Sequence, residues 1–279
     1  MKPKRLVLVT NDDGVRSEGL FELAKAASKH ADVVVVAPDQ PQSATAMSLT
    51  FHKPLRVEKY PGRFECYAVS GSPGDCVMVG VNKLLPRRPD LVVSGINVGD
   101  NDTFQDILAS GTVAAALQAS IAGIGAVAFS MEVEGVLEAE LSRPLPRFSE
   151  AGEVTSAIVK DVLTHGMPEE ADILNVNFPS HVSPSTEVSL TGVGRRKYTD
   201  RVIVRKDPRG RPYYWLFGEK LPEFPKGTDA DAVLSKHLVS VTPIALKMSG
   251  PITKSLEELK GRVGAELAKT GSRSRSMDK

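Results

Sequence analysis

Two short apolar runs, at residues 6–10 and 32–37, flank a segment that has the periodicity of an amphipathic helix. The runs are rich in β-branched residues and lack polar alternation, which is typical of strands buried on both faces of a parallel sheet. In the segment between them, residues 17–30, the apolar side chains are spaced for one buried helix face. The sequence therefore predicts that the chain begins with a strand–helix–strand unit of an α/β fold.

The same alternation continues well beyond this first unit. Further strands are expected at residues 90–94, 125–130 and 173–177, further helices at 73–85, 111–122 and 146–165, and a short antiparallel pair at 55–60 and 64–69. Connections of this type place helices on both faces of a mostly parallel sheet. Residues 1–185 are therefore interpreted as a Rossmann-like α/β core.

The pattern changes after this core. Residues 187–216 have the character of long strands around the turn signal Asp-Pro-Arg-Gly-Arg-Pro at 207–212, which predicts a protruding β-hairpin. The elements expected to follow are a short helix beginning at 227–231, a strand at 238–243 and a terminal helix at 255–269. We interpret residues 186–270 as an oligomerisation region and residues 271–279, rich in serine and arginine, as a disordered tail.

Charge and apolar content argue against several classes of partner. A formal net charge of +1 gives no basis for non-specific nucleic-acid binding. No apolar stretch has the length of a membrane span, and too few apolar residues follow the basic N-terminus for a signal peptide. The chain has two cysteines, which favours a reducing compartment and predicts a cytoplasmic protein. The five histidines show no metal-ligand spacing.

An amide, two adjacent carboxylates and a glycine follow the first predicted strand, as Asn11-Asp12-Asp13-Gly14. In open α/β sheets, ligands bind just beyond the carboxyl ends of the strands. Two neighbouring carboxylates repel each other there, and a hard divalent cation that prefers oxygen ligands would compensate them. The plainer alternative is that Asp12 or Asp13 only caps the helix that follows.

Other strand ends on the same edge of the predicted sheet carry small polar residues. Ser43 follows the second strand, and Asn97 follows the next strand of the core. Ser110-Gly111-Thr112 begins a predicted helix, where free backbone N–H groups and the helix dipole favour an anion. Each of these has a structural alternative, as a loop hydroxyl, a tight turn or a helix N-cap. Together they predict a metal-dependent phosphate site.

These motifs resemble those of the SurE family (survival protein E) of metal-dependent nucleotidases. The matching segments follow the family's order along nearly the whole chain: Thr10-Asn11-Asp12-Asp13-Gly14, Ala37-Pro38-Asp39 with Gln42-Ser43, 71–77, 94–101, 110–116, and Thr228-Asp229 with 239–243. There are two departures. Gly74 stands where many relatives carry alanine, and the helix after Thr112 lacks the acidic residue that is common before its glycine. Because of the second departure, the resemblance defines the substrate less closely than it defines the class of reaction.

The resemblance also implies which residues form the site. It implies one divalent metal ion per subunit, Mg²⁺ or Mn²⁺, with four ligands: Asp12, Asp13, Ser43 and Asn97. It further implies that Asn11 and Ser110-Gly111-Thr112 bind phosphate, and that Asp12, Asp13 and Asn11 are catalytic. Residues 1–185 would then be the catalytic core.

The implied activity is hydrolysis of nucleoside monophosphates, at the 5′ position and in some relatives also at the 3′ position. A metal-activated water would attack phosphorus in line. The resemblance implies a homodimer or homotetramer that exchanges C-terminal elements, without a membrane or a specific nucleic-acid partner. Aromatic residues of the hairpin region could stack on a nucleobase, although packing in the hairpin or at a subunit contact is the favoured interpretation: Tyr198, Tyr213, Tyr214 and Trp215.

Two rival functions stay open at this point. A haloacid-dehalogenase-like phosphatase also begins with a strand and acidic residues, but its chemistry uses two aspartates separated by one residue, whereas Asp12 and Asp13 are adjacent. A module that binds nucleotides without turnover is the non-enzymatic alternative. A dinucleotide-dependent oxidoreductase is disfavoured, since no Gly-x-Gly-x-x-Gly follows the first strand.

Overall fold

The computed structural model describes residues 4–133 and 147–277, and within them nine strands form one sheet in the order β3-β4-β2-β1-β5-β6-β7-β11-β8. Its strands are β1 (Leu6–Thr10), β2 (Asp32–Pro38), β3 (Val57–Lys59), β4 (Glu65–Val69), β5 (Leu91–Val98), β6 (Ala126–Met131), β7 (Ile173–Phe178), β8 (Val188–Leu190) and β11 (Val239–Ile244). In this spatial order, all neighbouring strands between β4 and β7 pair in parallel. Strand β3 pairs antiparallel with β4, and β11 pairs antiparallel with β7. The predicted Rossmann-like, mostly parallel sheet is confirmed.

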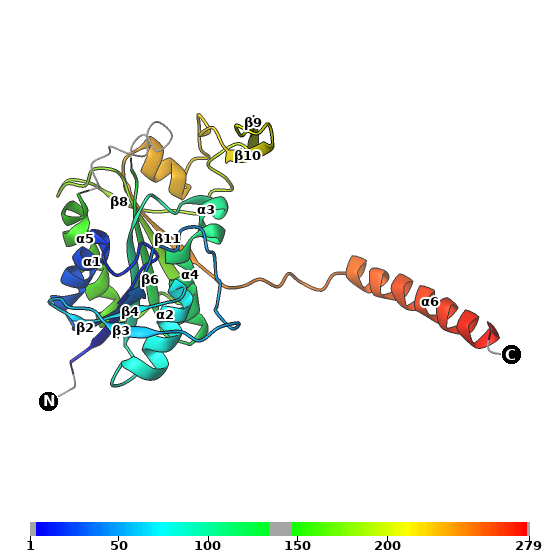
Figure 1. The fold of residues 1–279 in the computed structure, drawn as a ribbon, viewed down its shortest axis with the longest axis horizontal. Coiled ribbons are helices and arrows are strands. Elements are labelled where there is room, and N and C mark those ends of the chain that lie inside the picture. The colour runs from blue at the N-terminus through cyan, green and yellow to red at the C-terminus, as the bar shows by residue number, and fades with distance from the viewer. Residues whose placement is uncertain (1–3, 134–146, 278–279) are drawn as a thin grey trace. The chain divides into compact units, whose positions relative to one another are not determined.

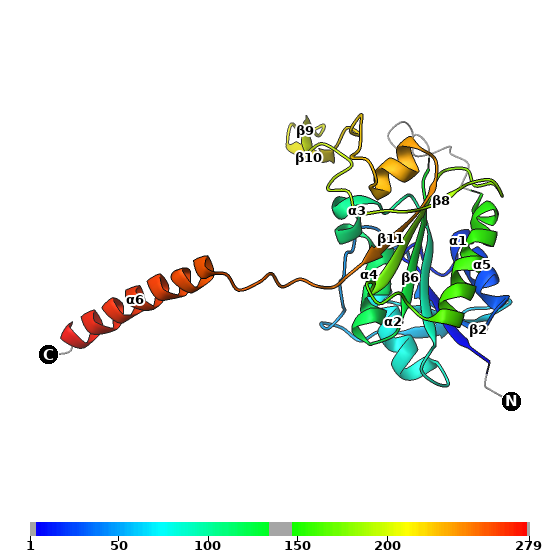
Figure 2. The same cartoon turned by 180° about the vertical axis from the view of Figure 1, so that it is seen from behind.

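Helices cover both faces of this sheet (Figures 1 and 2). They are α1 (Glu18–Ser28), α2 (Pro73–Val79), α3 (Thr103–Ala109), α4 (Gly111–Ile121) and α5 (Phe148–His165), with π-helical turns at Gly80–Leu84 and Asp231–Ser235. Val7 and Val9 of β1 pack in a core cluster with residues of α1 and α5. Leu6 and Leu8 pack in a second cluster with residues of α2 and α4. Because both faces of β1 are buried, its sequence shows no polar alternation.

Part of the predicted region 186–270 lies in the main sheet, because β8 and β11 belong to that sheet. The role of this region in oligomerisation stays a prediction. The chain divides into the units Met1–Ala245 and Leu246–Lys279. The second unit contains α6 (Lys254–Met277), which extends beyond the expected helix and includes most of the segment expected to be disordered. Arginine and lysine are good helix formers, and extending an existing helix costs far less than nucleating a new one.

The expected β-hairpin is present as a two-stranded sheet of its own, formed by β9 (Arg201–Lys206) and β10 (Pro212–Phe217). The connecting turn is held by Asp207, whose Oδ1 accepts hydrogen bonds from the backbone N–H groups of Arg209 and Arg211, both at 2.9 Å. Gly210 adopts a φ of 78°, a left-handed conformation that glycine tolerates best. None of the described helices is long and apolar enough to cross a membrane.

Gly19 allows α1 to lie directly against β5. A Cβ atom built on Gly19 would lie 2.0 Å from the backbone oxygen of Ile96. We expect Gly19→Ala to lower the free energy of unfolding by about 3 kcal/mol, because neither backbone can move without repacking the core. Gly152→Ala in α5 is the matched control, since that Cβ would meet nothing within 4 Å. Urea unfolding of both variants tests this, and equal stability of the two would contradict it.

Candidate functional site

A cavity of about 210 Å³ lies where the carboxyl ends of β1 and β5 approach the N-terminus of α4. Five residues predicted for the site line it: Asp12, Asp13, Ser43, Asn97 and Ser110. Strands β1 and β5 are parallel neighbours, with Thr10 opposite Ser94, so the residues that follow them emerge at the same edge of the sheet. The expected convergence of strand ends on one site is therefore present in the structure.

Asp12 is buried below the first turn of α4 and has only 6% of its surface exposed. Its Oδ1 accepts a hydrogen bond from the hydroxyl of Thr112. Burial raises the pKa of this carboxyl, and the contacts with Thr112 and Gly111 oppose that rise. The helix N-terminus carries partial positive charge, which favours an anion here. The site thus holds a carboxylate that is poorly hydrated and fixed in direction.

Gly111 is required for this close approach. A Cβ atom at Gly111 would lie 2.8 Å from the Cβ of Asp12, 2.9 Å from its Oδ2 and 3.2 Å from the Cγ of Pro73. A side chain at this position would therefore push Asp12 away from the start of α4.

Asp13 is half-buried beside Asp12. Its Oδ2 accepts a hydrogen bond from the backbone N–H of Val98 at 3.2 Å, which ties the end of β1 to β5. Burial, and then the charge of Asp12, raise the pKa of Asp13 to about 7. The two neighbouring carboxylates therefore lack full compensation within the protein, which is the situation that a bound cation would relieve.

Asn97 reaches the cavity because β5 is irregular before it. The register with β6 shifts between Ser94 and Asn97, and Gly95 adopts a φ of 125°. A Cβ atom at Gly95 would lie 2.1 Å from the backbone oxygen of Phe129, so only glycine allows this path. The Asn97 amide nitrogen donates a hydrogen bond to the backbone oxygen of Gly99 at 2.7 Å. Because the nitrogen is used in this way, the Asn97 side-chain oxygen is left as a potential ligand.

Ser43 lies in the exposed loop after β2 and also lines the cavity. The loop is attached to the site on one side by Gln42, whose backbone N–H donates to the backbone oxygen of Asp12 at 2.7 Å. On the other side, the backbone N–H of Ala46 donates to the backbone oxygen of Ala109 at 3.0 Å. These two bonds hold the Ser43 hydroxyl next to the paired carboxylates.

Ser110 lines the cavity, whereas Thr112 and Asn11 are buried behind its wall. Ser110 is the N-cap of α4, and its hydroxyl accepts a hydrogen bond from the backbone N–H of Val113 at 3.1 Å. Thr112 is fully buried and contacts Asp12 rather than open space. Asn11 is also fully buried, and its side chain makes hydrogen bonds of 3.2 and 3.1 Å to the backbone of Gly14. Asn11 therefore shapes the turn, and its role in phosphate binding stays a prediction.

Asn101, which belongs to the motif 94–101 noted in the sequence, also lines this cavity. Its backbone N–H donates to Oδ1 of Asn177 at 2.7 Å, and its amide donates to the hydroxyl of Ser130 at 2.8 Å. Ser130 and Asn177 are fully buried in β6 and β7. Polar residues inside these otherwise apolar strands therefore anchor the loop that carries Asn101.

A second set of charged residues at the cavity was not identified from the sequence. Asp100 and Asp106 line the cavity, and both contact the ammonium group of Lys197. Burial opposes the charge on Lys197, but its acidic neighbours outweigh burial and raise its pKa above the ordinary range. No pattern in the sequence links Lys197 to Asp100, because the two meet only through the fold.

The side-chain atoms that line the cavity decide which metal ion it can bind. Among the described residues, no group of three His, Cys, Asp or Glu side chains is arranged to hold a metal ion. A cation at Asp12 and Asp13 would therefore need the hydroxyl of Ser43 and the amide oxygen of Asn97 as further ligands. Such an all-oxygen donor set fits Mg²⁺ or Mn²⁺.

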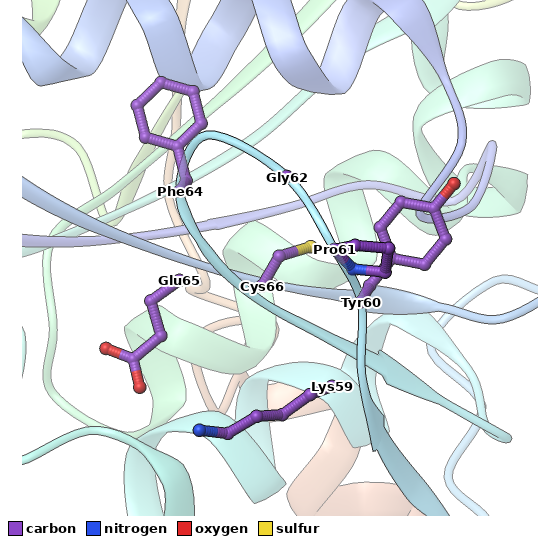
Figure 3. Close-up of a pocket in the computed structure, with 7 residues that line it drawn as sticks. All are labelled: Lys59, Tyr60, Pro61, Gly62, Phe64, Glu65 and Cys66. Atoms are coloured by element: carbon purple, nitrogen blue, oxygen red, sulfur yellow. The ribbon is translucent and has the colours of Figure 1, made fainter.

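A different cavity, of about 380 Å³, lies at the turn between β3 and β4 (Figure 3). Tyr60, Pro61 and Phe64 supply most of its apolar lining, and Lys59 and Glu65 are its charged residues. This turn precedes β4 and therefore lies at the amino ends of the parallel strands. It lacks the paired carboxylates, so the cavity at Asp12 is the better candidate for catalysis.

Comparisons with known proteins agree with the motifs at this cavity. The family described as Survival protein SurE matches residues 7–200. The chain belongs to the SurE family. This confirms the resemblance found in the sequence, and the matched region includes every predicted site residue.

Individual SurE proteins match over nearly their whole length. The chain is 41% identical to 5′-nucleotidase SurE of Methanosarcina acetivorans over 256 residues, covering 90% of this chain and 95% of that protein. It is 42% identical to 5′-nucleotidase SurE of Thermofilum pendens over 265 residues, covering 92% and 96%. The crystal structure of SurE from Aquifex aeolicus superposes with a TM-score of 0.78 at 39% identity, covering 91% of this chain and 99% of that chain.

Proposed function

We propose that this SurE protein is a metal-dependent phosphomonoesterase that hydrolyses nucleoside 5′-monophosphates. The observation that carries the proposal is the pair of adjacent, poorly hydrated carboxylates, Asp12 and Asp13, at the carboxyl ends of the parallel strands. The curated relatives that are named 5′-nucleotidase SurE support the choice of substrate. The proposal includes hydrolysis at the 3′ position by the same site, which the activity of the protein on 3′-AMP tests.

The proposed cofactor is one Mg²⁺ or Mn²⁺ ion per subunit, with Asp12, Asp13, Ser43 and Asn97 as its ligands. Such an ion would neutralise charge on the phosphoryl group and make a nearby water more acidic. One of the two aspartates would accept the proton that this water loses.

The protein groups around the cavity would hold the phosphate. Backbone N–H groups in the first turn of α4, at Gly111 and Thr112, face the Asp12 carboxylate, and in this proposal they also donate to the equatorial phosphoryl oxygens. In this proposal Asn11 also contributes, directly or by fixing the turn before Gly14. Charge that develops on these oxygens during hydrolysis would be stabilised by donors that are already oriented.

The proposed assembly is a cytoplasmic homodimer or homotetramer that exchanges C-terminal elements. The hairpin supports an interface, because its apolar side chains are exposed in the single chain: Val202, Val204, Trp215 and Leu216. Exposed apolar patches of this kind mark interaction surfaces. The favoured interpretation, that the hairpin aromatics pack in the hairpin or at a subunit contact, stays a prediction.

A phosphate-release assay separates this proposal from its rivals. We would measure phosphate from AMP, GMP, 3′-AMP, an aryl phosphate and tripolyphosphate, each with Mn²⁺ and with EDTA. The proposal expects nucleotide hydrolysis that EDTA abolishes. Nucleotide binding without any phosphate release would indicate the non-catalytic module. A trapped phospho-aspartate would indicate the haloacid-dehalogenase-like mechanism.

Removal of metal should destabilise the protein more at high pH than at low pH. Asp13 has a pKa of about 7 in the folded protein, above the usual 3.8, so the folded state binds more protons than the unfolded state between these values. The stability of the metal-free protein should therefore fall as pH rises from about 4 to about 7. Thermal unfolding at pH 5 and pH 8, with and without Mn²⁺, measures this. Equal stabilisation by Mn²⁺ at both values would contradict the metal assignment of Asp13.

A further inference from the structure

Carboxyl groups are the only strongly acidic or basic side chains among the described residues that line the catalytic cavity. They belong to Asp12, Asp13, Asp100 and Asp106. The proposed function uses Asp12 and Asp13, as metal ligands and as acceptors of the proton that the attacking water loses. The other half of the proton balance is still open, because the oxygen of the leaving nucleoside needs a proton when its bond to phosphorus breaks. Asp100 and Asp106 are therefore the candidates for the proton donor.

Asp100 is held in its charged form. Its Oδ2 accepts a hydrogen bond from Nζ of the buried Lys197 at 2.7 Å. Burial by itself would raise the pKa of Asp100, but the Lys197 ammonium group and the Asp102 side chain outweigh burial and lower that pKa. Asp100 therefore balances the charge of Lys197 and is unsuited to donate a proton.

Asp106 has the surroundings of a carboxyl group that keeps its proton. Its Oδ2 lies 2.6 Å from Nζ of Lys197, but Asp100 and the completely buried Asp102 contact the same ammonium group. One positive charge cannot balance three carboxylates that are removed from water, so protons are retained in this cluster. Burial raises the pKa of Asp106, and the Lys197 charge opposes that rise. The charges of Asp100 and Asp229 raise it further.

Two carboxyl groups in one cavity thus have pKa values that are shifted in opposite directions. Such a separation is typical of sites in which one acidic side chain stays ionised and another donates a proton. The Asp106 side chain is 23% exposed, so it lies nearer the mouth of the cavity than the buried Asp12 and can exchange its proton with solvent.

Asp106 also reaches the cavity from a different element than the paired carboxylates. In-line displacement places the attacking water and the leaving oxygen on opposite sides of phosphorus. Asp12 and Asp13, which would serve the water, follow β1, whereas Asp106 belongs to α3. The backbone oxygen of Asp106 accepts a hydrogen bond from the backbone N–H of Ser110 at 2.8 Å, which fixes this part of α3 against the start of α4.

We propose that Asp106 is the general acid of this site and protonates the leaving oxygen of the nucleoside. The water oxygen forms a bond to phosphorus while the bond from phosphorus to the nucleoside oxygen breaks. The electron pair of the broken bond stays on the nucleoside oxygen, which takes the Asp106 proton. The Lys197 ammonium group stabilises the carboxylate that remains, and solvent returns the proton. The inference rests on the proposed function, because it assumes that nucleotide hydrolysis takes place at Asp12 and Asp13.

Two substrates with different leaving groups test this inference on the full-length chain at saturating Mn²⁺. The aryl substrate para-nitrophenyl phosphate releases a stable phenolate that needs no proton, whereas AMP releases an alkoxide that does. Asp106→Asn keeps the shape of the side chain and removes its acidic proton. It is expected to lower kcat for AMP about a hundredfold and to leave kcat for the aryl substrate within about threefold.

Asp100→Asn is the matched control, because Asp100 lines the same cavity and contacts the same ammonium group. Its effect should be the same factor for both substrates. Asp106→Ala should show the same difference between the substrates as Asp106→Asn, so the test does not depend on one variant. Equal losses for the two substrates in the Asp106 variants, or no loss for AMP, would overturn the inference. An unmodified chain that does not hydrolyse AMP would instead contradict the proposed function, and the inference with it.

Discussion

Asp12→Asn is expected to lower phosphate release from AMP by about a thousandfold, because it removes a charged ligand of the proposed metal without changing the shape of the site. The asparagine oxygen can still accept the hydrogen bond from Thr112. Burial disfavours the Asp12 charge, so the neutral side chain should leave the metal-free fold as stable as before or more stable. Steady-state kinetics with saturating Mn²⁺, together with thermal unfolding, measure the two effects.

Asp161→Asn is the matched control for this prediction. Asp161 lies on α5, and 69% of its side-chain surface is exposed. Within the described residues, its ion pair is with His165. Asp161→Asn makes the same chemical change and should therefore leave turnover unaltered. Turnover of Asp12→Asn within a few-fold of the unmodified chain would show that Asp12 does not bind the catalytic metal.

Gly111→Ala is expected to lower turnover by about a hundredfold and the free energy of unfolding by about 1–3 kcal/mol. The added methyl group would overlap the Cβ and Oδ2 of Asp12 and press on Pro73. Either Asp12 or the first turn of α4 has to move, and the proposed reaction uses groups of both. Kinetics and urea unfolding of the purified variant measure the loss.

Gly152→Ala serves again as the control, because it adds the same methyl group within a helix where nothing lies within 4 Å. It should keep full activity and gain up to about 1 kcal/mol of stability from its higher helix propensity. If Gly111→Ala matched this control in both measurements, the close packing of Asp12 against α4 would have no functional importance.

The strand–helix alternation and the site residues at strand ends could be predicted because they depend on local sequence. Buried parallel strands are apolar throughout, so Leu6–Thr10 and the strands that follow are easy to recognise. Asp12, Asp13 and Asn97 come directly after such strands or near their ends, and the topology then brings them to one edge. Ser43 follows the second strand in the same way, and the family motifs added its implied role as a metal ligand.

The features that were missed depend on contacts between distant segments. Lys197 and Asp100 are far apart in the chain, and nothing in the periodicity around Lys197 marks it as buried. The short helix α3 (Thr103–Ala109) was not predicted; it begins at Thr103, whose backbone N–H is bound by the buried carboxylate of Asp229. Strands β8 and β11 join the main sheet through long-range pairing, so composition could not assign them to it.

The most direct test of the central claim is a crystal of the full-length chain soaked in MnCl₂ and measured at the manganese absorption edge. We expect one anomalous peak within bonding distance of the Asp12 and Asp13 carboxylates, with the Ser43 hydroxyl and the Asn97 side-chain oxygen as further ligands. Manganese bound at other places, with no peak between Asp12 and Asp13, would contradict the account.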